Sequence, residues 1–132
     1  MISREYIIDA SAVLALLFAE PGADRVAALA DFCFMTGVTV AEVISKLRQK
    51  SVVNPEAVLG ALQIEVEENF GSSVAEACGK LHAETRGMKG SPSLADCICL
   101  ALAERYSVTA VTAEKEWPAI VAGRGIQVLV IR

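Results

Sequence analysis

Four acidic residues of this chain are placed so that they could share one site, although they lie far apart in the sequence. They are Asp9, Glu42, Asp96 and Glu114. Asp9 directly follows a short apolar run, and Glu114 lies just beyond another. Glu42 and Asp96 each fall in the predicted first turn of a helix. If the apolar runs are parallel strands, all four carboxylates meet at one edge of a sheet.

Carboxylates gathered in this way favour the chemistry of a hard divalent cation. Like charges at close range raise each other's pKa, and a cation removes the conflict. Mg²⁺ prefers oxygen ligands and keeps several waters when only one or two carboxylates bind it. Such an ion can activate water and stabilise both oxygens of an in-line phosphoryl displacement. Nearby helix N-termini would favour the phosphate. The pattern therefore predicts phosphodiester hydrolysis.

Each acid also has a purely structural explanation. Thr39 and Glu42 have the spacing of a capping box, and Ser93 and Asp96 nearly match it. Capping alone would explain both acids, and Glu114 could be an ordinary exposed turn residue. The acid that ends the first apolar run is harder to explain, because burying a carboxylate there costs stability unless it is paired or liganded. The joint pattern favours the shared site.

Polar residues next to the acids are candidates for supporting roles. Ser11 is predicted to cap the first helix and to donate a hydrogen bond to an acid or phosphate. Thr112 is predicted to do the same at its strand end. The only histidine, His82, lies mid-helix and away from the acidic edge. Catalysis based on histidine therefore has little support.

Two groups of basic residues flank the acids. Lys46, Arg48 and Lys50 lie at the end of the Glu42 helix and are interpreted as solvated surface. Arg86 and Lys89 belong to a loop rich in glycine and proline that leads into the Asp96 helix. They are the better candidates for contact with substrate phosphates, which would be those of RNA if the resemblance described below holds.

The elements that must position these residues alternate along the chain. Short apolar runs predict strands at 6–8, 32–35, 64–66, 108–112 and 126–131. Helical periodicity and capping residues predict helices at 11–18, from 23, 39–50, from 54, 73–85, 93–106 and 113–120. Strands that alternate with helices imply right-handed crossovers and a parallel sheet. We predict a three-layer α/β/α domain.

Composition limits the class of protein. The chain has 132 residues, enough for one domain spanning 1–132. Hydrophobic residues make up 54%, yet no apolar run reaches the ~18–20 residues of a membrane helix. No signal-peptide pattern opens the sequence, so we expect a cytoplasmic protein with no membrane association. Its four cysteines lack zinc-site spacing and are expected to be free and buried. The formal net charge of −4 does not itself indicate nucleic-acid binding.

At this point the sequence resembles the PIN-domain ribonucleases, and most closely the VapC-type toxins of toxin–antitoxin pairs. The resemblance rests on four motifs in order: 8–14 (IDASAVL) with 20–22 (EPG), 41–47 (AEVISKL), 93–97 (SLADC) with 100–103 (LALA), and 111–114 (VTAE) with Trp117. Together they span nearly the whole chain.

The resemblance implies a parallel sheet of about five strands and a Mg²⁺- or Mn²⁺-dependent endoribonuclease. It also implies a homodimer and a small antitoxin protein that blocks the acidic pocket. By motif, Asp9, Glu42 and Asp96 are the core acidic residues, with Asp9 and Asp96 as direct metal ligands. Ser11 and Thr112 are supporting polar residues.

The fourth acid departs from the family pattern, in which Asp is usual. Here it is Glu114, whose extra methylene moves the carboxylate by roughly 1.5 Å. Catalytic geometry is sensitive to shifts of about that size. Glu114 is therefore expected to act through water or at a second, weaker metal site, and activity could be reduced.

Other readings of the acids are weaker. A haloacid-dehalogenase-like phosphatase would have a second Asp where Ser11 stands, and a response-regulator receiver would have paired acids near Asp9. The main alternative is a PIN-like interaction module with weak or no catalysis, which binds a partner through an apolar surface. Such a protein should bind Mn²⁺ weakly and show no metal-dependent cleavage.

Overall fold

The computed structural model describes residues 4–132 and contains one parallel sheet of five strands in the order β3-β2-β1-β4-β5. The strands are β1 (Tyr6–Ile8), β2 (Cys33–Thr36), β3 (Glu65–Glu67), β4 (Thr109–Thr112) and β5 (Gln127–Val130). The helices are α1 (Ala10–Leu17), α2 (Ala23–Leu29), α3 (Gly37–Gln49), α4 (Pro55–Gly60), α5 (Ser72–Glu84), α6 (Leu94–Tyr106) and α7 (Trp117–Ile120). The predicted α/β class with a parallel sheet is confirmed.

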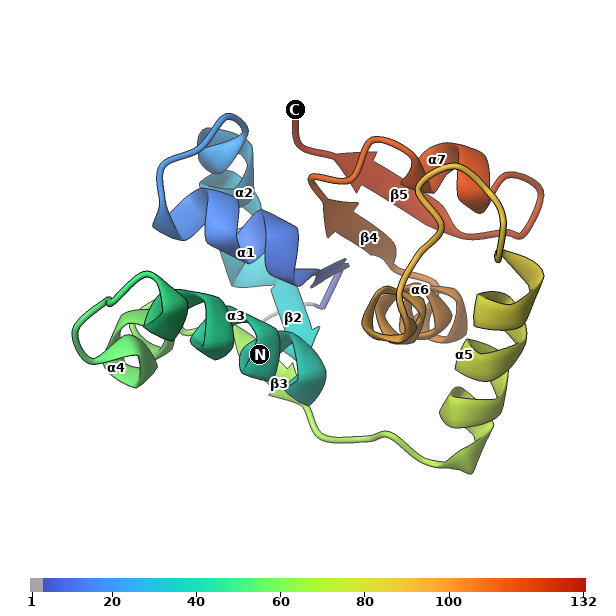
Figure 1. The fold of residues 1–132 in the computed structure, drawn as a ribbon, viewed down its shortest axis with the longest axis horizontal. Helices are drawn as coiled ribbons and strands as arrows, with labels where there is room; N and C mark the ends of the chain where they lie inside the picture. Colours follow the sequence, from blue (N-terminus) through green and yellow to red (C-terminus); the bar gives the residue numbers. More distant parts are fainter. Residues whose placement is uncertain (1–3) are drawn as a thin grey trace.

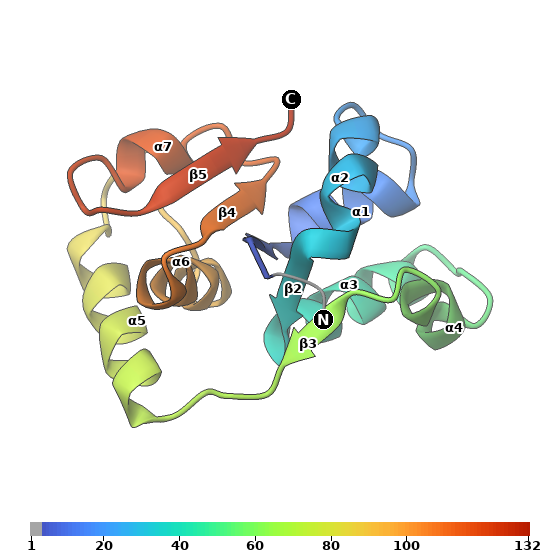
Figure 2. The ribbon, with the colours of Figure 1, turned by 180° about the vertical axis from the view of Figure 1, so that it is seen from behind.

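Helices cover both faces of this sheet, which gives three layers. Figures 1 and 2 show α1 to α4 on one side of the strands and α5 to α7 on the other. Within β1, Ile7 packs into the core beneath α5 and α6, whereas Ile8 packs beneath α1 and α3. Because helices cover both faces of β1, its neighbouring residues Ile7 and Ile8 are both fully buried although they point to opposite sides.

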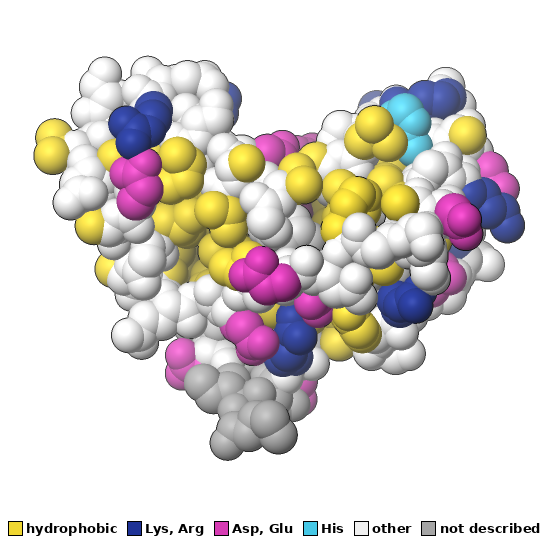
Figure 3. All heavy atoms as spheres, turned by 90° about the horizontal axis from the view of Figure 1, so that it is seen from below, with side chains coloured by type: hydrophobic (Ala, Val, Ile, Leu, Met, Phe, Trp, Pro, Cys, Tyr) yellow, Lys and Arg dark blue, Asp and Glu magenta, His cyan; other side chains and the backbone are white. Residues whose placement is uncertain are grey.

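The direction in which the chain crosses the sheet reverses at its centre. From β1 the chain moves outward through β2 to β3, and it then returns to place β4 and β5 on the other side of β1. The crevice outside the carboxyl ends of β1 and β4 is therefore a topological switch point, where ligands bind in open α/β sheets. Seen from below in Figure 3, the surface is hollowed between the two groups of helices.

Three predicted helix starts are wrong. Helix α1 is capped by Asp9, not Ser11, because the carboxylate of Asp9 accepts the Ala12 N–H. Helix α3 is capped by Thr36, whose hydroxyl accepts the Thr39 N–H, so it begins at Gly37. The helix predicted at 113–120 is limited to Trp117–Ile120.

The state of the cysteines agrees with the sequence analysis. Cys33, Cys78, Cys97 and Cys99 are all buried and free. Across residues 4–132, no helix has the length and apolar character needed to cross a membrane.

Candidate active site

Asp9 is the best-defined member of the site. It directly follows β1, is only 4% exposed, and caps α1. Its Oδ1 accepts hydrogen bonds from the Ala12 N–H at 3.0 Å and the Ser11 hydroxyl at 2.8 Å. Its Oδ2 accepts from the Thr112 hydroxyl at 2.7 Å and lies 3.0 Å from the same Ser11 hydroxyl. All these donors are neutral, so they orient the carboxylate without neutralising it.

Burial makes the negative charge of Asp9 unfavourable. Loss of solvent raises the pKa of Asp9 to about 6, although hydrogen bonds from Thr112, Ala12 and Ser11 act to lower it. The nearby charge of Asp96 raises it further. The carboxylate is therefore ionised at neutral pH at an energetic cost, and a cation bound beside it would remove that cost.

Ser11 and Thr112 connect the ends of β1 and β4 through this carboxylate. The Ser11 Oγ, which donates to Asp9, also accepts the Ala113 N–H at 2.9 Å. The fully buried Thr112 Oγ1 accepts the Glu114 N–H at 3.0 Å. The structure thus places both predicted supporting residues around Asp9. Each hydroxyl donates to the carboxylate and accepts from the loop that follows β4.

Asp96 approaches the same edge from the first turn of α6. Its side chain accepts the Ser93 N–H at 3.0 Å, while the Ser93 hydroxyl accepts the Asp96 N–H at 3.1 Å. This is a complete capping box, so the structural explanation for Asp96 holds. It engages only one of the two carboxylate oxygens, Oδ2. The other oxygen remains open to a ligand within the described part of the chain.

Glu42 reaches the site from α3, but not from the first turn as predicted. Because α3 begins at Gly37, Glu42 lies in the second turn and does not form a capping box with Thr39. Partial burial raises its pKa, and the charge of Asp96 raises it further. The structural explanation based on capping is therefore wrong for this acid.

Sequence patterns predicted Cys99 to be buried and free, but they did not place this thiol next to the acids. Burial raises the pKa of Cys99 well above its usual range, and the charges of Asp9, Asp96 and Glu42 all add to this. The three carboxylates therefore all lie near enough to Cys99 for their charges to disfavour its thiolate. Cys99 lies three residues after Asp96 in α6, and this helical spacing was the only signal in the sequence.

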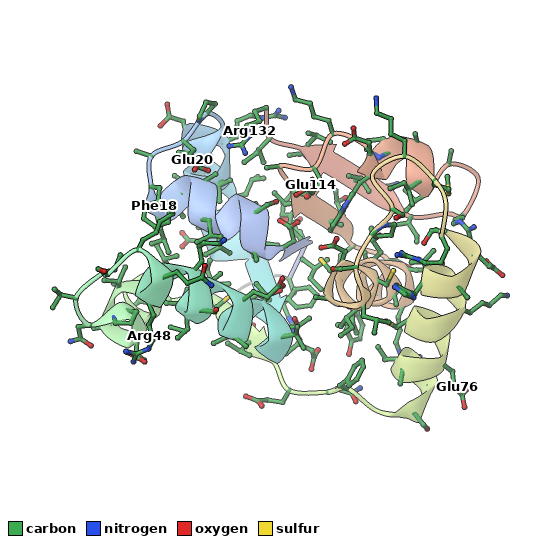
Figure 4. All side chains as sticks on the ribbon, viewed as in Figure 1. Phe18, Glu20, Arg48, Glu76, Glu114 and Arg132 are labelled. Carbon is green, nitrogen blue, oxygen red and sulfur yellow. The ribbon has the colours of Figure 1, made fainter. Side chains whose placement is uncertain are left out.

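Glu114 stands apart from the other three acids. Its side chain is exposed, and Figure 4 shows it just beyond the arrowhead end of β4. Its backbone is tied to the site through Thr112, but its charge does not contribute to the raised pKa values of Asp9 and Glu42. The structure places Glu114 at the rim.

The residues present fit a hard cation, although they do not form a closed set of ligands. In residues 4–132, no three His, Cys, Asp or Glu side chains converge with metal-ligand geometry. The same part of the chain places no Lys or Arg in a salt bridge with any of the four acids. A negatively charged edge with a buried carboxylate and no counter-ion from the described residues suits Mg²⁺, which needs only one or two direct carboxylate ligands.

The two predicted phosphate contacts differ in how far the fold already engages them. The Arg86 guanidinium donates to the carbonyl oxygens of His82 and Pro92, and so ties the end of α5 to the loop before α6. Lys89 is exposed in that loop. Arg86 therefore has a structural role that the sequence did not reveal.

Comparisons with known proteins agree with this geometry. A family model described as PIN domain matches residues 6–122. No curated protein matches the sequence significantly. Among solved structures, a toxin–antitoxin complex from Klebsiella pneumoniae superposes with a TM-score of 0.70 and 20% identity, covering 96% of this chain and 98% of that one.

Two further structures are similar over comparable lengths. VapBC2 from Rickettsia felis, bound to a promoter DNA fragment, gives a TM-score of 0.67 and 17% identity over 95% of this chain and 97% of that one. PAE2754 from Pyrobaculum aerophilum superposes with a TM-score of 0.66 and 19% identity, covering 97% of this chain and 90% of that one. At these identities the likeness establishes the fold.

Proposed function

The chain belongs to the PIN-domain family, and on this premise we propose that it is a Mg²⁺- or Mn²⁺-dependent endoribonuclease, the toxin of a toxin–antitoxin pair. PIN-domain proteins are nucleases, so the family supports hydrolysis of phosphodiester bonds. The choice of RNA rests on the resemblance of the four sequence motifs to VapC-type toxins. The remaining argument rests on the acidic edge.

One observation carries the proposal. Asp9, Asp96 and Glu42 come from three different elements and share one edge of the sheet, where Asp96 raises the pKa of both other acids. A fold maintains such a repulsive arrangement at a cost in stability. Arrangements of this kind are concentrated at functional sites.

The side chains suggest a division of roles. Asp9 and Asp96 would hold the ion directly, and Asp96 would do so through Oδ1, the carboxylate oxygen that its capping box leaves open. Glu42 and the rim residue Glu114 would act through water. When bound, the ion supplies charge neutralisation at the scissile phosphate and a lower pKa for an attacking water. Ser11 and Thr112 hold the Asp9 carboxylate in one orientation.

An apolar surface supports a protein partner. A cavity of about 260 Å³, lined largely by apolar side chains, opens where α3, α4 and β3 meet. Figure 3 shows apolar side chains gathered on this side of the molecule. Patches of this type mark protein–protein contacts. We propose that the apolar surface on this side of the molecule provides the contacts with the antitoxin and with a second copy of the chain in a homodimer.

The decisive experiment measures cleavage of single-stranded RNA by the purified chain. We expect cleavage with Mg²⁺ or Mn²⁺ and none with a chelator. Asp9→Asn and Asp96→Asn should each abolish cleavage while circular dichroism shows a folded domain. Glu104→Gln, an exposed acid of α6, is the matched control and should cleave normally. Equal activity in chelator, or in either Asn variant, would refute the proposal.

The same samples distinguish the interaction module considered above. If the site has lost catalysis, Mn²⁺ should bind weakly, Asp9→Asn should not change that binding, and no metal should produce cleavage. Tight Mn²⁺ binding that is lost in Asp9→Asn supports a working metal site.

A further inference from the structure

A groove between α1 and α3 begins beside the acidic edge. Its volume is about 420 Å³, and it is open to solvent. Ala10 and Leu14 of α1 form part of its apolar wall. Helix α3 contributes the apolar residues Val38 and Ala41 and, along the same wall, the polar side chains Glu42, Ser45, Lys46 and Gln49. Since Glu42 belongs to both the site and the groove, a chain bound at the site can continue into the groove.

Lys46 is the positive charge that remains available in this groove. On the same helix, Arg48 is paired with Glu56 of α4, and Figure 4 shows it on the α4 side of α3. The Lys50 ammonium lies 5.7 Å from the centre of the Phe18 ring, at the end of α1. Within residues 4–132, no carboxylate lies within salt-bridge distance of Lys46.

The order of charge along α3 is suited to a polyanion that enters from the acidic edge. Glu42 and Lys46 are one helical turn apart on the same side of α3, which separates them by roughly 6 Å along the axis. That distance is comparable to the step between neighbouring phosphates in an extended single strand. Beyond Lys46, the Gln49 amide donates to the Ser45 hydroxyl at 3.0 Å, so this pair presents fixed polar groups at the groove wall.

We propose that this groove binds the single-stranded RNA backbone on one side of the scissile bond, and that Lys46 contacts a neighbouring phosphate. The inference rests on the proposed ribonuclease function and names the path of the substrate. The apolar cavity near α4 suits a protein side chain, whereas this groove combines an ammonium, a hydroxyl and an amide on one wall. Polar contacts of this kind position a nucleic-acid backbone without reading its sequence.

Binding of RNA in chelator tests the groove without requiring activity. The probe is a fluorescently labelled ten-nucleotide single-stranded RNA, followed by anisotropy across a range of KCl concentrations. Lys46→Gln should weaken binding by roughly three- to tenfold at low salt and reduce the slope of log affinity against log salt by about 0.7. Lys80→Gln, the same change on the exposed surface of α5, should alter neither quantity.

Folding does not confound this comparison. Lys46 is exposed, and Gln has nearly the same helix propensity as Lys, so the substitution should leave the urea midpoint of unfolding nearly unchanged. With Mg²⁺ present, Lys46→Gln should raise KM for a twelve-nucleotide substrate and leave kcat unchanged. It should have no effect on a substrate too short to enter the groove.

The outcomes separate the two proposals. Lys46-dependent binding without any cleavage supports the groove and refutes the nuclease. Normal cleavage, with identical salt slopes in Lys46→Gln and Lys80→Gln, refutes the groove alone. Absence of RNA binding by the unaltered chain also refutes the groove. If Lys46→Gln weakens only the binding of a partner protein, the groove is a protein contact and the inference is wrong.

Discussion

Two clusters of carboxylates in this molecule differ in how their charge is balanced. In the first, the Arg4 cluster, the Arg4 guanidinium lies 3.2 Å from Glu67 and 3.7 Å from Glu65. It also stacks over the Phe34 ring at 3.9 Å and approaches Tyr106 at 5.9 Å. Burial of Glu67 acts to raise its pKa, but hydrogen bonds and the charge of Arg4 lower it overall. The fold supplies the counter-ion.

The second cluster, formed by Asp9, Glu42 and Asp96, has neutral hydrogen-bond donors and no such cation among residues 4–132. Burial again acts to raise the pKa, and here the hydrogen bonds do not compensate, so the pKa of Asp9 is raised to about 6. The two clusters contain the same chemical group with opposite net shifts. On this difference we propose that the Arg4 cluster stabilises the fold, whereas the acidic cluster is arranged for a cation from solution.

The largest effect expected from this contrast is on stability after Asp9→Asn. A rise of the Asp9 pKa from 3.8 to about 6 corresponds to about 3 kcal/mol. The native state binds the extra proton, so the favourable contribution is complete below pH 3.8 and is lost as the pH rises through 6. With a chelator present, the unfolding free energy of Asp9→Asn should therefore exceed that of the unaltered chain by up to about 3 kcal/mol at pH 7. At pH 4 the difference should be small. Urea unfolding at both pH values measures this.

Mg²⁺ should reverse that order, because an ion that binds only the native state stabilises it. The unaltered chain should gain stability with added Mg²⁺, and Asp9→Asn should gain much less. If Asp9→Asn destabilises the chelated protein at pH 7, the carboxylate is a structural group like Glu67 and the contrast fails.

The next effect concerns the hydroxyl that orients Asp9. Thr112→Val removes the 2.7 Å hydrogen bond to Oδ2, which acts to lower the pKa of Asp9. That pKa should therefore rise above 6, and metal affinity or activity should fall by about 10- to 100-fold, as for other groups that orient metal ligands. Thr109→Val, at the opposite end of β4, is the matched control. Equal losses in both variants would indicate a general effect on the strand.

Sequence patterns were sufficient for the architecture because each element carries a local signal. The apolar run 6–8 and the Ser93 cap predicted β1 and α6 at their observed positions. The convergence of Asp9 and Asp96 then followed from the rule that strand ends and helix starts share one edge. Neither step required knowledge of distant contacts.

The missed features depended on choices between competing local partners. Asp9 and Ser11 can both cap α1, and the end of β1 at Ile8 places Asp9 at the cap. Thr36 competed with Thr39 in the same way. Thr36 became the cap of α3 because β2 continues to Thr36, where it pairs with β3. The Arg86 contacts to backbone carbonyls depended on the path of a loop, for which the sequence carries no periodic signal.

A smaller effect is expected when the Arg4 cluster loses its cation. Arg4→Met keeps an apolar stem over Phe34 but leaves Glu67 without its counter-ion, so unfolding free energy should fall by about 1–2 kcal/mol. Arg124→Met, which breaks a more exposed pair with Glu84, should lower the unfolding free energy less. Metal-dependent kcat should be unchanged below the melting transition. A loss of kcat in folded Arg4→Met would mean that the two clusters are coupled.

The smallest effect should come from the rim. The charge of Asp96 raises the pKa values of Asp9, Glu42 and Cys99, whereas Glu114 is not a cause of any of these shifts. Glu114→Gln should therefore lower cleavage by less than about tenfold, which corresponds to about 1.4 kcal/mol. Glu114→Asp, which restores the usual family residue, should match or exceed the unaltered chain. A loss of about a thousandfold in folded Glu114→Gln would place this carboxylate among the metal ligands, and the acidic cluster would then extend to the loop after β4.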